Sequence, residues 1–162
     1  MAECVIFIGL PASGKTTFYH QRFAATHRHI SKDHWPAAAN KGARQAALIS
    51  TALAEAVLVV VDNTNPSIAD RAAIIALARE HGARTVGYYF TATTREAVGR
   101  NRARDGKQRV PDVAIFTKAK QMVIPTREEG FDELNAVSIC EEGKFEIRPI
   151  HGDGRIQRPA VE

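Results

Sequence analysis

The stretch Gly9-Leu10-Pro11-Ala12-Ser13-Gly14-Lys15-Thr16 decides the fold of this chain. It follows the apolar run 4–8, which is typical of a buried parallel strand, and residues 17–25 after it have the pattern of a helix. A loop of the form G-x-x-x-x-G-K-[ST] between a strand and a helix is a P-loop, which holds the phosphates of a nucleotide. The sequence therefore predicts a nucleoside triphosphate site at this loop.

The residue types of the loop suit the binding of ATP and Mg²⁺. Two glycines let the backbone wrap closely around a phosphate, so that successive N–H groups point toward it, and the helix start adds a partial positive charge. The Lys15 ammonium can reach the β- and γ-phosphates, and the Thr16 hydroxyl can ligate Mg²⁺, with Thr17 as a further donor. The expected nucleotide-binding residues of the loop are Gly9, Pro11, Ala12, Ser13, Gly14, Lys15, Thr16 and Thr17.

The composition is ordinary for one globular domain. The 162 residues are 44% hydrophobic and 25% charged, and the net charge of +4 permits a polyanionic partner without requiring one. We expect a single P-loop kinase domain over residues 1–150 and a loose polar tail over 151–162. No apolar stretch is long enough to cross a membrane and no targeting segment precedes the first strand, so we expect a cytoplasmic protein. Cys4 and Cys140 lack the spacing of a metal site and are expected to be free, buried thiols.

Short apolar runs alternate with helical patterns along the chain. The expected strands are 4–8, 27–31, 56–61, 84–90, 136–139 and 144–148, of which the last two form a hairpin. The expected helices are 17–25, 41–55, 66–80, 93–104 and 112–122. Asn65 is expected to cap the third helix, and Thr93 with Glu96 to form a capping box on the fourth. This alternation predicts an α/β fold in which a parallel sheet is covered by helices on both faces.

Two aspartates stand where expected strands end. Ligands bind beyond the carboxyl ends of the strands in such a sheet, so Asp33, Asp62 and the P-loop should surround one crevice. Asp33 is the best candidate for the residue that faces an attacking hydroxyl, although it could instead cap the turn before Pro36. Asp62 could hold the water shell of Mg²⁺, bind the acceptor, or cap the helix that follows it.

The rest of the sequence restricts the class of nucleotide-binding protein. A GTPase reads guanine with N-K-x-D, but residues 40–43 read Asn-Lys-Gly-Ala and no better match is present. Motor ATPases generally need a longer chain. A small P-loop kinase remains, in which the acceptor binds across the crevice from the nucleotide.

The most basic stretch of the chain is 100–109. Arg100 and Arg104 have i, i+4 spacing, which would place them on one face of the expected helix. We interpret the stretch as part of a mobile, arginine-bearing helical lid in which Arg104 closes on the transferring phosphate, as an arginine finger does. The alternative is a solvent-exposed basic face. Arg102 could contact adenine or a nucleic-acid phosphate.

Aromatic and imidazole side chains contribute one further candidate. Trp35 could stack on a base of the acceptor, or it could anchor the core near the crevice. The six histidines show no metal-ligand spacing, so we interpret them as surface or structural residues.

Several blocks of the chain together resemble the polynucleotide 5′-hydroxyl kinases, especially the kinase half of the polynucleotide kinase–phosphatases. The P-loop is shared by many proteins, but the combination of Asp-Asn-Thr-Asn-Pro at 62–66 with Pro-Thr-Arg-Glu-Glu-Gly-Phe at 125–131 is far more specific. The other blocks are Ser-Lys-Asp at 31–33, Arg-Asn-Arg-Ala-Arg at 100–104 and Val-Pro-Asp-Val at 110–113.

This resemblance implies a P-loop kinase fold, with ATP and Mg²⁺ as the phosphate donor and a nucleic-acid 5′-hydroxyl end as the acceptor. It implies that Asp33 is the general base, that the lysine and threonine of the P-loop contact the phosphates and the metal ion, and that Arg104 is the lid arginine. It also suggests that Asp62 and Asn63 lie in the acceptor pocket.

The sequence departs from the family in two respects. Some family members carry an arginine soon after the catalytic aspartate that grips the acceptor phosphate, whereas this chain reads His34-Trp35-Pro36. No D-x-D-G-T phosphatase motif appears, so we expect kinase activity alone. Two other functions stay open at this point: a kinase for a small metabolite or nucleotide sugar, and an ATP-dependent binding module that transfers no phosphate.

Overall fold

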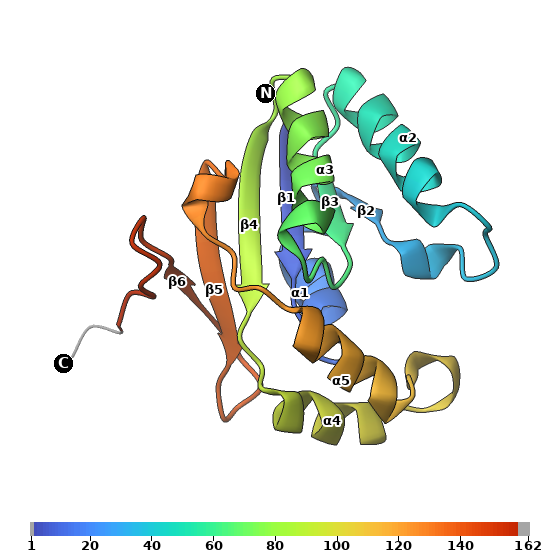
Figure 1. Ribbon diagram of the computed structural model, residues 1–162, viewed down its shortest axis with the longest axis vertical. Helices are drawn as coiled ribbons and strands as arrows, with labels where there is room; N and C mark the ends of the chain where they lie inside the picture. Colours follow the sequence, from blue (N-terminus) through green and yellow to red (C-terminus); the bar gives the residue numbers. More distant parts are fainter. Residues whose placement is uncertain (1, 159–162) are drawn as a thin grey trace.

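A six-stranded sheet forms the centre of the structure, a computed structural model that describes residues 2–158 (Figure 1). Its strands are β1 (Glu3–Ile8), β2 (Arg28–Ile30), β3 (Val59–Asp62), β4 (Arg84–Phe90), β5 (Glu133–Ile139) and β6 (Phe145–Pro149). Their order in the sheet is β2-β3-β1-β4-β5-β6. Neighbouring strands pair in parallel from β2 to β5, and β6 pairs antiparallel with β5. The structure confirms the expected parallel sheet with a closing hairpin.

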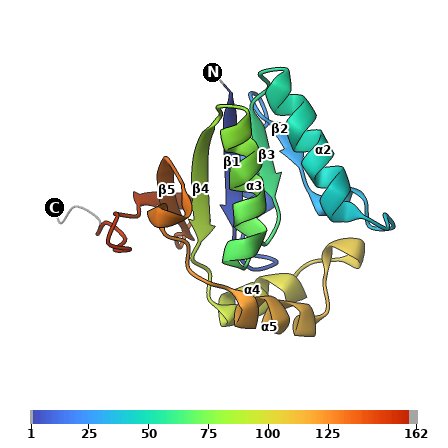
Figure 2. The same ribbon diagram turned by 45° about the horizontal axis from the view of Figure 1, so that its top comes forward.

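Helices cover the sheet on both faces, as the sequence predicts. They are α1 (Lys15–Arg22), α2 (Lys41–Ala54), α3 (Ile68–Glu80), α4 (Thr94–Arg102) and α5 (Asp112–Gln121), with short 3₁₀ turns η1 (Lys32–His34), η2 (Gly106–Gln108) and η3 (Arg127–Glu129). Figures 1 and 2 show α2 and α3 on one face of the sheet, α1 on the other, and α4 with α5 beyond the carboxyl ends of the strands. Within residues 2–158, no helix combines the length and apolar character needed to cross a membrane.

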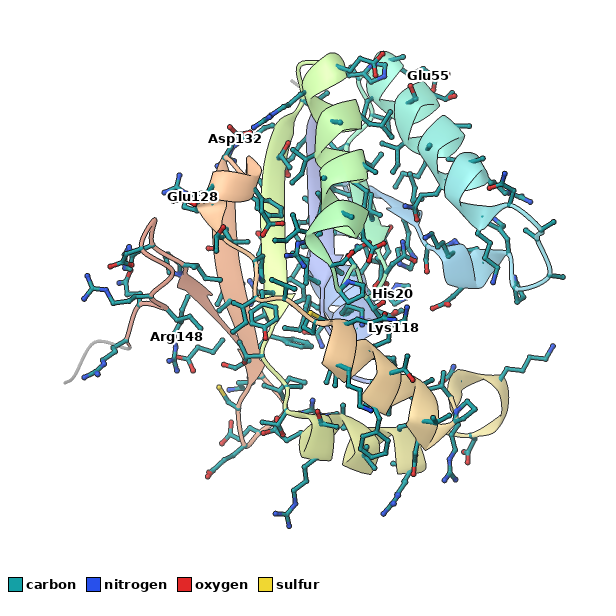
Figure 3. The ribbon with its side chains drawn as sticks, in the orientation of Figure 1. His20, Glu55, Lys118, Glu128, Asp132 and Arg148 are labelled. Carbon is teal, nitrogen blue, oxygen red and sulfur yellow. The ribbon has the colours of Figure 1, made fainter. Side chains whose placement is uncertain are left out.

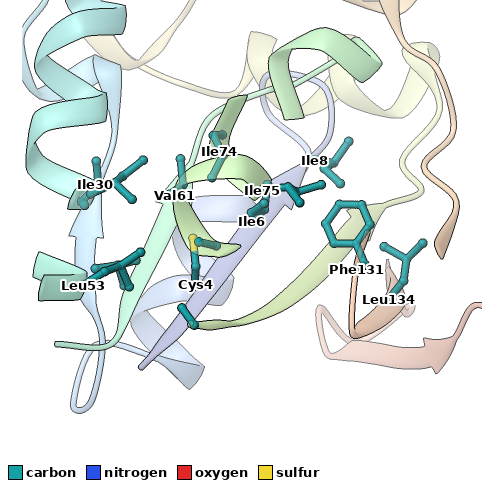
Figure 4. Close-up of a cluster of buried hydrophobic side chains, with 14 of the residues drawn as sticks. Cys4, Ile6, Ile8, Ile30, Leu53, Val61, Ile74, Ile75, Phe131 and Leu134 are labelled. Atoms are coloured by element: carbon teal, nitrogen blue, oxygen red, sulfur yellow. The ribbon is translucent and has the colours of Figure 1, made fainter. Parts of the chain in front are cut away.

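Strand β1 lies in the middle of the sheet and is buried on both faces. Its even-numbered residues join the cluster under α2 and α3 (Figure 4). Its odd-numbered residues join the aromatic cluster under α1, where the Phe7 and Phe18 ring centroids are 5.7 Å apart. Because successive side chains of a strand point to opposite faces, both sets must be apolar, which explains the unbroken run 4–8.

The start of α3 differs from the expectation. The predicted cap at Asn65 is wrong: α3 begins at Ile68, and Ser67 caps it in a capping box with Asp70. Asn65 instead has a left-handed backbone (φ 43°), and its amide donates to the Phe7 carbonyl at 2.8 Å. Asn65 therefore ties the loop after β3 to β1 instead of starting a helix.

Three smaller expectations also need correction or comment. Cys4 is buried, but Cys140 is exposed because it follows β5 at the hairpin turn, so the prediction of a second buried thiol is wrong. Of the expected tail 151–162, residues 151–158 are exposed and 159–162 lie outside the described residues. Thr93 caps α4 by accepting from the Glu96 amide at 3.2 Å.

Candidate active site

The P-loop connects β1 to α1 in a strained conformation. Ala12 has φ 63° and Gly14 has φ 96°, both in the left-handed region, where a residue without a side chain is favoured. At Gly9 a Cβ atom would lie 2.8 Å from the Phe90 Cβ, so a larger residue would collide with β4. The Gly9 amide donates to the Thr64 carbonyl at 3.0 Å, which joins the start of the P-loop to the loop after β3.

Lys15 is buried at the centre of this loop. Its ammonium donates to the Leu10 carbonyl at 2.7 Å and to the Gly9 carbonyl at 3.1 Å. Burial lowers the pKa of Lys15 to about 8; the carboxylates of Asp62 and Asp33 act in the opposite direction, and the Arg104 guanidinium lowers the pKa further. Of these three side chains, Asp62 contacts the P-loop directly, because its Oδ2 accepts from the Thr16 hydroxyl at 2.9 Å. That Asp33 and Arg104 complete the same crevice remains a prediction.

The lowered pKa predicts that ATP binding takes up a proton in alkaline solution. At pH 9 Lys15 is mostly neutral, and a bound triphosphate favours its charged form, so the Kd for ATP should rise by up to about tenfold per pH unit above pH 8. Titration calorimetry in buffers of different ionisation enthalpy measures this uptake. Lys15→Met should bind ATP more weakly and without the proton; equal uptake in both proteins would contradict the assignment to Lys15.

Asp62 ends β3 and is buried, with a relative exposure of 4%. The Thr16 hydroxyl donates to its Oδ2 at 2.9 Å, and His29 Nε2 lies 2.7 Å from the same oxygen. Burial raises the pKa of the Asp62 carboxyl, but the hydrogen bonds from His29 and Thr16 and the charge of Lys15 outweigh it and lower the pKa below its usual value. Asp62 is therefore kept as a carboxylate beside the P-loop.

His29 is a site residue that sequence reasoning missed. Its ring stacks on Tyr19 of α1, with ring centroids 4.0 Å apart and an interplanar angle of 13°, and this contact directs it at Asp62. The interpretation of the histidines as surface or structural residues did not single out His29, whose structural contact holds Asp62 beside the P-loop. The pairing of β2 beside β3 brings His29 to Asp62, and that pairing joins segments about thirty residues apart.

The donor atoms at this point fit Mg²⁺. Thr16 and Asp62 offer a hydroxyl and a carboxylate, hard oxygen ligands 2.9 Å apart at the mouth of a phosphate cradle. In the part of the chain that the structure describes, no cluster of three or more His, Cys, Asp or Glu side chains could hold a metal. This combination suits an ion held mainly by phosphate oxygens and water, as Mg²⁺ is at kinase sites.

Asp33 lies in η1, directly after β2. Ser31 caps this turn, because its hydroxyl accepts from the Asp33 amide at 3.2 Å. The Asp33 side chain is exposed, and among residues 2–158 its carboxylate accepts no hydrogen bond. Asp33 is therefore not needed as the cap of its own turn, and its carboxylate is free to meet a substrate.

Trp35 and Asn63 flank this turn. Trp35 is half-buried against the core, and the Arg44 guanidinium lies 4.8 Å from its ring centroid. The Asn63 side chain accepts from the Lys32 amide at 2.9 Å and donates to Gln45 at 2.6 Å. The polar atoms of Asn63 are thus engaged within the protein.

The expected lid stretch 100–109 covers the end of α4 and η2, and α5 follows it. The P-loop residue Leu10 packs against Ala97 of α4 and Ile115 of α5, so the two helices rest on the phosphate cradle. Arg104 follows the end of α4 at Arg102, so the prediction that it shares a helix face with Arg100 is wrong. The Arg104 guanidinium donates to the Gln108 carbonyl at 3.3 Å.

Arg102 is exposed and points to a different partner. Its guanidinium lies 3.5 Å from the Asp112 carboxylate at the start of α5. An exposed ion pair at this distance contributes little to stability and is easily exchanged for another anion. Contact between Arg102 and a nucleotide remains a prediction.

A buried ion pair lies behind the site and was also missed. Arg71 of α3 has a relative exposure of 0% and forms a double hydrogen bond with Glu129, at 2.7 and 3.1 Å. Its remaining donor reaches the carbonyls of Asn65 and Pro66, at 3.1 Å each. The two specific sequence blocks 62–66 and 125–131 therefore meet through Arg71.

Most other charged side chains are exposed to solvent, unlike the buried pair of Arg71 and Glu129. Glu55 and Glu128 are exposed and project away from the sheet (Figure 3). A fully buried guanidinium must be paired to be tolerated, so the Arg71–Glu129 contact holds η3 against the loop that supports the P-loop.

Comparisons with known proteins agree with this geometry. The model of a family described as AAA domain (AAA_33) matches residues 4–123. A putative bifunctional polynucleotide phosphatase/kinase of Acanthamoeba polyphaga mimivirus is 29% identical over 143 residues, which is 84% of this chain. The chain spans 33% of the length of that relative.

Solved structures show the same fold at low sequence identity. A gluconokinase from Sinorhizobium meliloti superposes with a TM-score of 0.61 and 18% identity, covering 86% of this chain and 83% of that one. A fungal RNA kinase superposes with a TM-score of 0.64 and 14% identity, covering 85% of this chain and 38% of that one.

The fold is that of a P-loop kinase. A mostly parallel sheet carries the P-loop after β1, and Asp62 at the end of the neighbouring strand β3 contacts this loop through Thr16. The chain belongs to the AAA domain family (AAA_33).

Proposed function

We propose that the chain transfers the γ-phosphate of ATP to the 5′-hydroxyl of a polynucleotide. The observation that supports the transfer is the carboxylate of Asp33, which stands just beyond the carboxyl end of β2, is exposed, and has no hydrogen-bond partner within residues 2–158. The polynucleotide acceptor is supported by the sequence blocks at 62–66 and 125–131 and by the name of the mimiviral relative.

The proposed step is an in-line displacement. The oxygen of the acceptor hydroxyl bonds to the γ-phosphorus, the bond from that phosphorus to the bridging oxygen breaks, and ADP leaves. Asp33 orients the hydroxyl and accepts its proton late in the step. Lys15 and Arg104 offset the negative charge on the phosphoryl oxygens. Thr16 and Asp62 would hold Mg²⁺, which would supply positive charge to offset that of the phosphates.

Arg104 is proposed to act when the region around α4 and η2 closes over the phosphates. Arg104→Ala should lower kcat by about 10²-fold and weaken ATP binding far less, because the charge that Arg104 meets develops in the transition state. Steady-state kinetics with a direct nucleotide-binding measurement separates the two effects. Arg95→Ala, an exposed residue in the first turn of α4, is the matched control. If ATP binding weakens while kcat holds, Arg104 is a ground-state clamp.

The proposed acceptor is tested by transfer of labelled γ-phosphate from ATP with Mg²⁺. A 5′-hydroxyl oligonucleotide should be labelled, and the same oligonucleotide already carrying a 5′-phosphate should not. DNA and RNA versions are compared in parallel. Absence of labelling on every oligonucleotide would overturn the polynucleotide acceptor.

A small metabolite or nucleotide sugar is the second candidate acceptor. It is favoured by the segment after Asp33, where His34 and Trp35 stand in place of an arginine that could grip an acceptor phosphate. Exposed His34 and half-buried Trp35 would suit a small polar acceptor. A panel of sugars and sugar acids in the same labelling assay tests it, and labelling confined to this panel would establish it.

A further inference from the structure

The turn that carries Asp33 is held from outside by one side-chain amide. Asn63, the residue after β3, accepts a hydrogen bond from the backbone N–H of Lys32 at 2.9 Å. Lys32 is the first residue of η1 and the immediate neighbour of Asp33. The side chain of Asn63 therefore fixes the backbone one residue before the proposed general base.

The other end of the Asn63 amide is also held. Its Nδ2 donates to Gln45 Oε1 at 2.6 Å, and Gln45 lies on the buried side of α2 with a relative exposure of 7%. A buried amide that loses its partner is costly, so the two side chains hold each other in one orientation. One pair of amides thus ties together the end of β3, helix α2 and the turn η1.

The hydrogen bonds of Asn63 matter because the Asp33 carboxylate has no hydrogen-bond partner of its own in the part of the chain that the structure describes. Within residues 2–158 no partner fixes the carboxylate itself, so its place depends on the backbone of η1. Ser31 caps the turn from within, and Asn63 is the contact that ties the turn to the strand beside the P-loop strand. A displacement of about 1 Å at a reacting group can cost about 10²-fold in rate.

We infer that Asn63 and Gln45 are positioning residues that set the distance between the Asp33 turn and the nucleotide cradle. This inference rests on the proposed transfer reaction, in which Asp33 meets the acceptor hydroxyl. It gives Asn63 a role different from the acceptor contact that the sequence blocks suggest. Gln45, on α2, is buried and reaches the Asp33 turn through Asn63.

The first test is kinetic and uses Gln45, which is buried on α2 and hydrogen-bonded to Asn63. Gln45→Met removes the acceptor oxygen at nearly constant volume and should lower kcat about tenfold, with the Kd for ATP unchanged within twofold. Gln45→Glu keeps an oxygen that accepts from Asn63 and should restore kcat to within about threefold of the parent protein. Ala47→Ser, on the exposed side of α2, is the matched control. Equal kcat values for Gln45→Met and the parent protein would overturn the inference.

Asn63→Ala separates positioning from acceptor binding. Positioning predicts a fall in kcat with the KM for the acceptor little changed. A direct contact with the acceptor predicts a raised KM for the acceptor in Asn63→Ala and no effect of Gln45→Met, and that result would overturn the inference.

A second readout is independent of the acceptor. Amide hydrogen exchange of Lys32, followed by NMR, should become about tenfold faster in Asn63→Ala and in Gln45→Met, because the N–H loses its fixed partner. Unchanged exchange in both variants would overturn the positioning role whatever the enzyme phosphorylates. If the parent protein labels no hydroxyl acceptor while Lys32 exchange responds as expected, the proposed function fails and the structural pair stands.

Discussion

Replacing Asp33 with Asn lowers phosphoryl transfer by about 10²- to 10⁴-fold, while ATP binds with unchanged affinity. The amide has nearly the shape of the carboxylate but cannot accept the proton of the acceptor hydroxyl. Because this proton moves late in a loose transition state, the loss should fall nearer the lower end of the range. Single-turnover transfer of labelled phosphate measures the chemical step, and calorimetry measures ATP binding separately.

The control for Asp33→Asn is a carboxylate outside the crevice. Glu55 is exposed and follows the carboxyl-terminal end of α2. It lies toward the end of the sheet where the strands begin, whereas the P-loop lies at the end where they finish (Figure 3). Glu55→Gln should leave both measurements unchanged. If Asp33→Asn transfers phosphate at the parent rate, Asp33 is not the base. If the parent protein binds ATP and transfers phosphate to nothing, the chain is a binding module.

The sheet was predictable from the sequence because its signals are local. The run 4–8 is apolar at every position, and a strand buried on both faces requires this pattern. The cap of α3 was not predictable in the same way. Asn65 and Ser67 are both good capping residues, and the choice between them depends on the contact of Asn65 with Phe7 across the sheet.

The candidate site residues also divide into those with a local sequence signal and those whose place depends on tertiary contacts. Asp33 and Asp62 were proposed because both stand at strand ends, and the carboxyl ends of parallel strands share one side of the sheet. The structure places Asp62 against Thr16 of the P-loop. His29 and Gln45 were missed because their roles depend on which strand pairs with β3 and on how α2 is rotated. The strand pairing and the rotation of α2 are both tertiary features, which no local sequence pattern predicts.

Replacing Glu129 with Ala lowers the free energy of unfolding by about 3–5 kcal/mol. The change leaves the Arg71 guanidinium, at 0% relative exposure, without its carboxylate in the protein interior. Urea unfolding followed by circular dichroism measures the loss. Glu128→Ala is the matched control, because Glu128 precedes Glu129, is exposed and makes no ion pair within residues 2–158. It should lower the free energy of unfolding by less than about 0.5 kcal/mol.

A double replacement, Arg71→Met with Glu129→Leu, shows which part of the loss comes from the uncompensated charge. Removing both charges should recover most of the stability, but the carbonyls of Asn65 and Pro66 lose their donor and the Thr126 amide loses its acceptor, so a deficit of about 1–3 kcal/mol should remain. Part of that deficit falls on the loop whose Thr64 carbonyl accepts from the Gly9 amide of the P-loop. The double variant should therefore bind ATP more weakly than its stability alone explains, when both are measured well below the unfolding midpoint. Parent-like ATP affinity in a destabilised double variant would show that the P-loop keeps its shape without this support.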